Sequence, residues 1–215
     1  MSNYILAAAL GKSQNRFSVS VYSGLEIKGL SPLNYFAVID TGCAVTKLTM
    51  QTMNVSNWER FKNNDILAYK NGNVEVRPSY GVSDTEKALN ISSLSDDELH
   101  NSKNVAFKHF IKSLSINGYS FGYNQYTCKL SYNQVGPSLI GMNILNKMDF
   151  HCGYSRLLKQ FVFIGCLRTD INIDYLEVLS DHLGYLPNKK FIKELIDWKK
   201  IDRNDDFIQK EYSVS

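Results

Sequence analysis

Proline and long apolar runs are both scarce in this chain. It holds four prolines in 215 residues and no low-complexity tract, which argues against extensive disorder. No apolar run reaches the roughly 20 residues that a membrane-spanning helix needs. The apolar stretch from Met1 to Leu10 is short and lacks a basic start, so we expect a first strand or a short helix there rather than a signal peptide. We therefore expect a cytoplasmic protein with no membrane partner.

A strong excess of charge of one sign is also lacking. The formal net charge is +3, and no basic stretch is interleaved with aromatic residues, so we expect no nucleic-acid partner. Cysteine is scarce as well, with Cys43, Cys128, Cys152 and Cys166. None belongs to a Cys-x-x-Cys pair, and no histidine stands at metal-ligand spacing from any of them. We expect free thiols, no metal site and no organic cofactor.

Tyrosine and phenylalanine are abundant instead. The chain has 13 Tyr and 11 Phe among 44% hydrophobic residues, which suits a β-rich core. Alternating polar and apolar residues predict a hairpin over residues 15–30 that turns at Ser23-Gly24. The dipeptide Asn71-Gly72 predicts a second hairpin. Further predicted elements are a helix start or exposed loop at 95–98, strands at 105–116, 126–132 and 161–164, and a short helix at 144–148.

The composition changes after Cys166. Asn172 or Asp174 can cap a helix that Gly184 ends, and Asn188 can cap a second helix with lysines along one face. The chain therefore divides into a mainly β domain over residues 1–166 and a C-terminal helical tail over residues 167–215. The tail either packs on the domain or contacts a partner or a membrane, and the sequence leaves these readings open.

The tripeptide Asp40-Thr41-Gly42 is the most informative motif. It ends the apolar run Tyr35 to Ile39, which reads as a buried strand. A charge at the edge of a core costs several kcal/mol unless it is paired, hydrogen-bonded or protonated. A carboxylate delivered to that position is therefore a candidate for chemistry, although Asp and Gly are also common in ordinary turns.

A second motif lies about a hundred residues downstream. Residues 138–145, Ser-Leu-Ile-Gly-Met-Asn-Ile-Leu, read as an apolar strand, a glycine at position 141 and a helical turn. In this order the two motifs resemble those of the retropepsin family of aspartic proteases, and the resemblance covers roughly residues 15 to 165. It implies a closed retropepsin-like β-barrel with short helices over residues 1–166 and an aspartic endopeptidase activity.

Aspartic peptidases need two carboxylates that share a proton, one to deprotonate a water and one to polarise the scissile carbonyl. This chain has one Asp-Thr-Gly, and Ser83-Asp84-Thr85 lacks the glycine and the apolar strand. The second aspartate must then come from another copy of the chain. The resemblance thus implies an obligate homodimer, with the active site on its two-fold axis and a peptide or protein as substrate.

The resemblance assigns the catalytic segment residue by residue. Asp40 would be the shared general acid and base, the hydroxyl of Thr41 would bridge the two loops across the dimer axis, and Gly42 would let a backbone N–H approach the carboxylate. Gly141 would let the second segment pass behind the catalytic loop, although a glycine there can also simply open a helix. The predicted substrate-binding residues are Tyr80, Gly81, Val82 and Gly141, the first three in a flap over the cleft.

Two departures from the family pattern bear on function. Cys43 follows the motif where Ala or Ser is usual, and a thiol is a weaker donor than a hydroxyl, so we expect activity to reach nearer to neutral pH. The chain between Asp40 and Gly141 is longer than in compact viral members. The excess is expected between residues 80 and 105, as an insertion near the flap or an inhibitory lid.

Two other functions remain compatible with the sequence. One is a catalytically silent retropepsin-like module that dimerises and binds a peptide. The other is an unrelated all-β binding domain in which both motifs are coincidental. The intact Asp-Thr-Gly favours the enzyme over the silent module, because a binding module need not keep a destabilising pair of carboxylates.

Overall fold

The computed structural model describes residues 2–9, 16–79 and 93–184. Over these residues the protein is mainly β with a few short helices, as predicted. The strands are β1 (Ile5–Ala8), β2 (Phe17–Leu25), β3 (Leu33–Ile39), β4 (Lys47–Thr49), β5 (Val76–Pro78), β6 (Val105–Ile116), β7 (Tyr119–Ser120), β8 (Tyr126–Ser131), β9 (Ser138–Ile140), β10 (Met148–Ser155) and β11 (Gln160–Leu167). The helices are α1 (Trp58–Lys70), α2 (Asp96–Asn101), α3 (Met142–Leu145) and α4 (Ile173–Leu183), with 3₁₀ turns at Met50–Thr52 and Arg168–Asp170.

The centre of the molecule is a closed β-barrel. The strands pair in the order β2, β3, β9, β4, β8 and β6, and pairing of β6 with β2 closes the ring. β2 shows why the sequence folds this way: Val19 and Val21 are buried in the core, whereas Ser20 and Tyr22 point outward and are exposed. This closed barrel confirms the predicted fold class.

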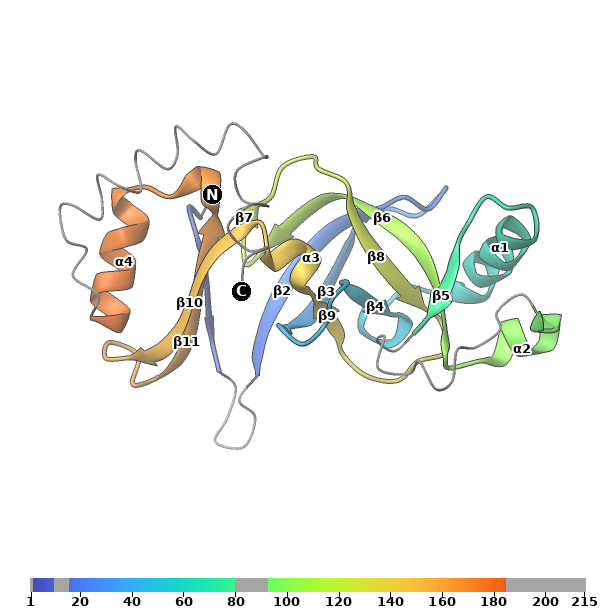
Figure 1. Cartoon of the computed structure of the whole chain (residues 1–215), viewed down its shortest axis with the longest axis horizontal. Helices are drawn as coiled ribbons and strands as arrows, with labels where there is room; N and C mark the ends of the chain where they lie inside the picture. Colours follow the sequence, from blue (N-terminus) through green and yellow to red (C-terminus); the bar gives the residue numbers. More distant parts are fainter. Residues whose placement is uncertain (1, 10–15, 80–92, 185–215) are drawn as a thin grey trace, which may run out of the picture.

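A second sheet lies beside the barrel. β11 pairs with β1 on one side and with β10 on the other, all antiparallel. Helix α4 packs on β10 and, in Figure 1, stands at the outer side of this sheet, at the opposite end of the molecule from α1 and α2. The hydroxyl of Tyr175 on α4 donates to the carboxylate of Asp149 on β10 at 2.9 Å. The part of the predicted tail that is described is thus docked on the β structure.

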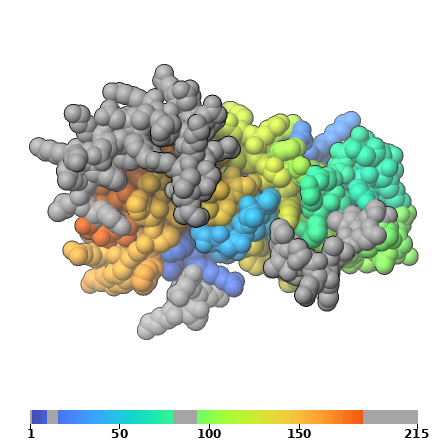
Figure 2. Space-filling view, in the orientation of Figure 1, coloured from blue at the N-terminus to red at the C-terminus, as the bar shows by residue number. Residues whose placement is uncertain are grey.

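Helices α1 and α2 form a projection at the other end of the barrel, drawn in teal and green in Figures 1 and 2. A buried polar group fixes α1 to the barrel. The Oδ2 atom of Asp65 on α1 lies 2.7 Å from Nε2 of His109 on β6, and the Tyr132 hydroxyl donates to the same oxygen at 2.6 Å. Trp58 and Phe107 pack their rings edge-on against Tyr132, so the polar group is enclosed by aromatic residues.

The predicted hairpin at Asn71-Gly72 is wrong. Residues 66–69 belong to the last turns of α1, and Asn71 caps this helix. Gly72 follows with φ +73°, the left-handed conformation that commonly ends a helix. An Asn-Gly dipeptide is common both in hairpin turns and at helix ends, because glycine readily adopts positive φ. The aromatic and apolar residues before it pack as a helix here rather than as a strand.

The predicted turn at Ser23-Gly24 is also wrong. Both residues lie inside β2, which runs without a break to Leu25, and the chain turns later at Gly29 with φ +81°. Gly24 sits at a register shift between β2 and β6, where a Cβ would stand 2.8 Å from Oγ of Ser113. The glycine fits this close approach of the Ser113 side chain from the neighbouring strand rather than a turn.

Other local predictions are confirmed. Ser95 forms a capping box with Glu98 at the start of α2. The dipeptide Asn-Gly does form a tight turn at Asn117 and Gly118, between β6 and β7, where both residues have positive φ. Asn172 caps α4, and Gly184 ends it with φ +72°. The second tail helix, predicted from Asn188, lies outside the described residues.

Within the described residues, no helix is both long and apolar enough to cross a membrane. No disulfide links described residues, and Cys128 and Cys166 are buried, whereas Cys152 is exposed. The same part of the chain holds no cluster of His, Cys, Asp and Glu with the arrangement of a metal site.

Candidate functional site

The two motifs meet at one end of the barrel. β3 runs parallel to β9, with Val38 opposite Leu139 and Ile39 opposite Ile140. The pairing continues past the end of β3, because the Asp40 N–H donates to the Ile140 carbonyl at 3.0 Å. Asp40 is therefore held in register with the second motif by a backbone hydrogen bond.

β9 lies between the two strands that flank the Asp40 loop. It pairs with β3 on one side and with β4 on the other, where Lys47 stands opposite Leu139. The chain from Asp40 to Thr46 must therefore pass over the end of β9 to reach β4. The strand-glycine-helix segment and the Asp-Thr-Gly loop form one unit, as the resemblance implied.

Gly141 is buried directly behind this loop. A Cβ atom on it would stand 2.7 Å from the Cys43 carbonyl oxygen and 2.8 Å from the backbone nitrogen of Thr46. Because backbone atoms cannot move away cheaply, a larger residue does not fit there without displacing the loop. Gly141 also stands before the first residue of α3. Its predicted contact with substrate stays a prediction.

Helix α3 braces the loop through its first N–H groups. Met142 N–H donates to the Cys43 carbonyl at 2.7 Å, and Asn143 N–H donates to the Ala44 carbonyl at 3.1 Å. The first N–H groups of a helix lack partners within it, so the loop carbonyls satisfy them. The loop carbonyls and the first N–H groups of α3 thus satisfy each other, which fixes the position of the loop relative to the helix.

Asn143 completes the brace with its side chain, and the sequence-based analysis missed it. Its Oδ1 accepts the Thr46 N–H at 2.7 Å and the Thr46 hydroxyl at 2.9 Å, and its Nδ2 donates to the Thr127 carbonyl at 2.6 Å. Thr46 Oγ1 in turn accepts the Gly141 N–H at 3.0 Å. The signal that could have found it is an amide side chain inside an otherwise apolar helical turn.

The Asp40 carboxylate is half-buried and oriented by its own loop. Its Oδ1 accepts the Gly42 N–H at 2.9 Å. A Cβ on Gly42 would stand 3.2 Å from that oxygen, so the absence of a side chain eases the close approach. Thr41 and Gly42 are exposed at the surface. The approach of the Gly42 N–H to the carboxylate is therefore observed, and the roles of Asp40 and Thr41 across a dimer axis stay predictions.

The thiol of Cys43 hydrogen-bonds to the backbone of its own loop. Its Sγ donates to the Val45 carbonyl at 2.9 Å. Burial raises the pKa of this thiol, and the nearby Asp40 charge adds to the rise, which Lys129 and Lys47 partly offset. A thiol with a raised pKa is a poor nucleophile at neutral pH, so the environment does not favour a cysteine-based reaction.

A cavity of about 620 Å³ opens at the Asp40 loop. Arg16 and Lys47 add two basic side chains to its wall, and neither was predicted as a site residue. Among the described lining residues, Asp40 is the one acidic side chain. The other lining residues come from the barrel and from the second sheet: Phe17, Val38, Ile39, Thr41, Thr49, Gln134, Val135, Gly136, Pro137, Leu139, Cys152 and Phe163.

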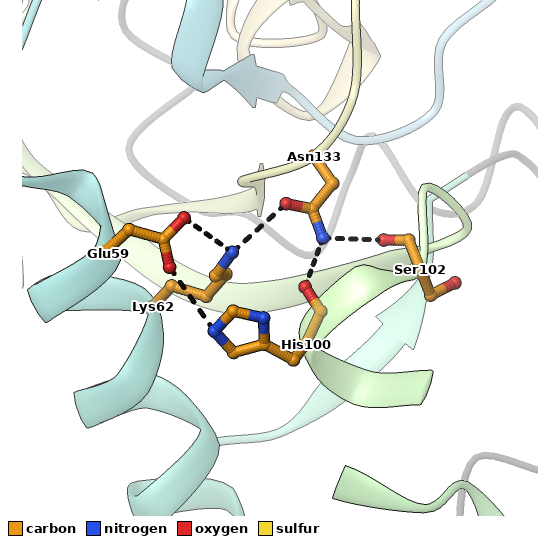
Figure 3. Close-up of polar contacts among 5 residues, drawn as sticks. All are labelled: Glu59, Lys62, His100, Ser102 and Asn133. Atoms are coloured by element: carbon orange, nitrogen blue, oxygen red, sulfur yellow. Dashed lines mark hydrogen bonds and ion pairs between the residues drawn. The ribbon is translucent and has the colours of Figure 1, made fainter. Parts of the chain in front are cut away.

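The cavity wall formed by residues 134–137 is held by the α1–α2 projection. Figure 3 shows Asn133 at the centre of this contact: its Oδ1 accepts from Lys62 Nζ at 3.3 Å, and its Nδ2 donates to the carbonyls of His100 and Ser102. Lys62 also pairs with Glu59 at 2.9 Å. The projection therefore fixes the residue directly before the cavity wall.

The flap candidates Tyr80, Gly81 and Val82 lie outside the described residues. The residue before them is buried at the cavity wall: Ser79 Oγ donates to Gln134 Oε1 and lies 3.0 Å from Ser131 Oγ. Lys129 Nζ donates to the Pro78 carbonyl at 3.1 Å. The last described residue before the predicted flap segment therefore contacts a residue that lines the cavity.

No family model and no curated protein sequence matches this chain. A similar solved structure is described as the crystal structure of a retropepsin-like aspartic protease from Rickettsia conorii. The two chains are 14% identical, with a TM-score of 0.42, and the match covers 76% of this chain and 90% of the other. A likeness at that level carries no argument about activity, so the functional assignment depends on the geometry of the Asp40 loop.

Proposed function

We propose that this protein is an aspartic endopeptidase that works as a homodimer, with Asp40 from each subunit in one active site. The observation that carries the proposal is the braced Asp40 loop, in which β9, Gly141 and α3 hold a carboxylate at the mouth of a cavity. An ordinary turn would not need Gly141 packed against its backbone or the Asn143 side chain, called the Asn143 clamp below, bonded to its last residue, Thr46.

The number of carboxylates in the cavity supports a dimer. Two acids that share a proton acquire different affinities for it, so that one can act as base and the other as acid. Asp40 is the one acidic residue among the described residues that line the cavity. A two-fold axis beside the exposed Thr41 and Gly42 would supply a second Asp40 without any further acidic residue in the chain.

In the proposed reaction, the ionised Asp40 takes a proton from a water as that water attacks the peptide carbonyl carbon. The protonated Asp40 of the second subunit donates a hydrogen bond to the carbonyl oxygen as it gains negative charge. The tetrahedral species then breaks its C–N bond, and the amine leaves with a proton from the pair. The Gly42 N–H keeps the carboxylate oriented throughout.

The direct test is the Asp40→Asn variant of the full chain. Peptide hydrolysis should fall to background while circular dichroism and the dimer mass by light scattering stay unchanged. The control is Asp174→Asn, an exposed acid in the first turn of α4, which should keep full activity. A stable dimer that hydrolyses no peptide even as wild type would favour the silent binding module instead.

A mixing experiment tests the shared site. If wild-type and Asp40→Asn subunits exchange freely in equal amounts, about one quarter of the dimers carry two aspartates, and activity should fall to about one quarter of that of an all-wild-type sample. Independent sites in each subunit would leave about one half. A value of one half, or full activity in a wild-type monomer, would overturn the proposal.

A further inference from the structure

Three lysines stand in line across three strands of the barrel. The register of β4 and β8 puts Lys47 opposite Lys129, and the register of β8 and β6 puts Lys129 opposite Lys108. Residues that oppose each other in a sheet point to the same face, so the three side chains share one face of the barrel. We call Lys47, Lys129 and Lys108 the lysine row.

The lysine row lies on the face that holds the cavity. The next residues in each strand, Leu48, Leu130 and Phe107, are buried in the core on the opposite face. Lys47 itself lines the cavity, and it stands opposite Leu139, another lining residue. The row therefore begins in the cavity beside the Asp40 loop and runs away from it across β8 to β6.

The row places like charges next to one another. Like charges directly opposite each other destabilise a sheet. Burial lowers the pKa of both Lys47 and Lys129, and the charge of Lys129 lowers the pKa of Lys47 further. Lys108 has a carboxylate partner in Glu75 at 2.9 Å, but the contact of Lys129 with Pro78 is to a neutral carbonyl. An anion above the row would relieve this repulsion.

We propose that the lysine row recognises an acidic side chain of the peptide substrate, so that the enzyme prefers Glu or Asp near the scissile bond. The proposal rests on the peptidase function stated above. It deepens that function by naming the substrate class, because Lys47 lies within the same cavity as Asp40.

A peptide fits this surface better than a nucleic acid. Val38, Ile39 and Leu139 form an apolar part of the cavity wall, and Lys47 stands beside Leu139 in the adjacent strand. An apolar side chain against Leu139 and an acidic one near Lys47 would satisfy both parts of the wall. Single-stranded nucleic acids stack their bases on aromatic side chains, whereas the residue of the wall that stands beside Lys47 is the aliphatic Leu139.

The test compares two peptides that differ only in Glu or Gln at one position, within a sequence that the wild-type enzyme cleaves. The wild type should show a kcat/KM roughly tenfold or more higher for the Glu peptide, as expected for a charge-assisted hydrogen bond. Lys47→Met should bring the ratio close to one, and Lys129→Met should lower it in part. The control Lys112→Met, an exposed lysine on β6 paired with Glu26, should leave the ratio unchanged.

Two results would overturn the inference while leaving the peptidase in place. One is a wild-type ratio at or below one at every position tested. The other is an unchanged ratio in both Lys47→Met and Lys129→Met. The second variant keeps the test valid if Lys47→Met does not fold. Thermal melting of each variant identifies a loss of folding.

Binding separates this inference from the peptidase proposal. The full-length Asp40→Asn protein is titrated into two labelled peptide pools with a fixed Leu followed by either Glu or Gln, and fluorescence anisotropy is recorded. Tighter binding of the Glu pool that weakens with salt and with Lys47→Met supports the lysine row even if no peptide is hydrolysed. Equal binding of the two pools overturns it. Displacement of both pools by a single-stranded DNA oligonucleotide at a lower concentration than unlabelled Glu peptide requires also overturns it.

Discussion

The backbone of Gly141 passes so close to the carbonyl oxygen of Cys43 that a Cβ atom on Gly141 would stand 2.7 Å from it. The same Cβ would meet the backbone of Val45 and Thr46 at 2.8 Å. The Asp40 loop and the segment behind it are thus matched to each other at backbone level, and a single added methyl group would separate them.

We therefore expect Gly141→Ala to lower the free energy of unfolding by about 1–3 kcal/mol and to reduce activity per folded dimer, because the loop must move. Urea denaturation and peptide hydrolysis measure the two effects. Gly29→Ala is the control: this glycine has φ +81° and a Cβ added to it would meet no other atom within 4 Å, so the substitution strains the backbone without moving the Asp40 loop. Equal activity in the two variants would contradict the expectation.

The amide of Asn143 leads to a second prediction. Asn143→Ala removes the partners of the Thr46 N–H and of the Thr127 carbonyl, and buried groups left without partners cost about 1–3 kcal/mol. The loss should appear in urea denaturation and as a lower kcat, since Thr46 anchors the end of the Asp40 loop. Asn146→Ala, at an exposed position after α3, should change neither quantity measurably.

The sequence predicted what depends on neighbouring residues. The strand that carries Asp40, the strand before Gly141 and the caps at Ser95 and Asn172 all show a local apolar pattern or a local capping residue, and each is confirmed. The prediction that the two motifs meet came from the family resemblance rather than from any local pattern. Its physical reason appears only in the structure, where β9 enters between β3 and β4.

What the sequence did not predict depends on contacts between distant residues. The Asn143 clamp joins positions 97 and 16 residues away, and the lysine row arises from strand register. The sequence around Gly24 predicts a turn because Ser113, whose hydroxyl approaches this glycine, lies 89 residues further along the chain. Strand β10 was missed as well, since its alternation is interrupted by Gly153 and by half-buried polar residues.

The environment of Cys43 leads to a third prediction. Because burial and then the Asp40 charge raise the pKa of its thiol, replacing Asp40 by Asn should lower that pKa and increase the thiolate fraction. Iodoacetamide at pH 8 should then modify Cys43 a few times faster in Asp40→Asn than in the wild type, as followed by mass spectrometry of the labelled peptide. Cys152, whose pKa is raised by partial loss of solvent around its thiol without an Asp40 contribution, serves as the internal standard. An unchanged ratio of the two rates would argue against the effect of Asp40 on this thiol.

The contact between α4 and the second sheet leads to a prediction about pH. Burial alone would raise the pKa of Asp149, but hydrogen bonds from His151 and Tyr175 outweigh it, so the pKa lies below its usual value. A carboxylate with a depressed pKa in the folded state stabilises the fold at pH values above its unfolded pKa of about 3.9, and this contribution is lost as the pH falls. Asp149→Asn should therefore lower the free energy of unfolding at pH 7 by about 1 kcal/mol, a value kept small because the side chain is one-third exposed. The difference from wild type should shrink as the pH drops below about 4.

Urea denaturation at a series of pH values between 3 and 7 measures that difference. Asp174→Asn, on the exposed side of α4, provides the matched control and should follow the wild-type curve at every pH. Tyr175→Phe should reproduce part of the loss, because it removes the hydroxyl that donates to the Asp149 carboxylate at 2.9 Å. If the wild type and Asp149→Asn differ by the same amount at pH 3 and pH 7, the ionised carboxylate is not what holds α4 to β10.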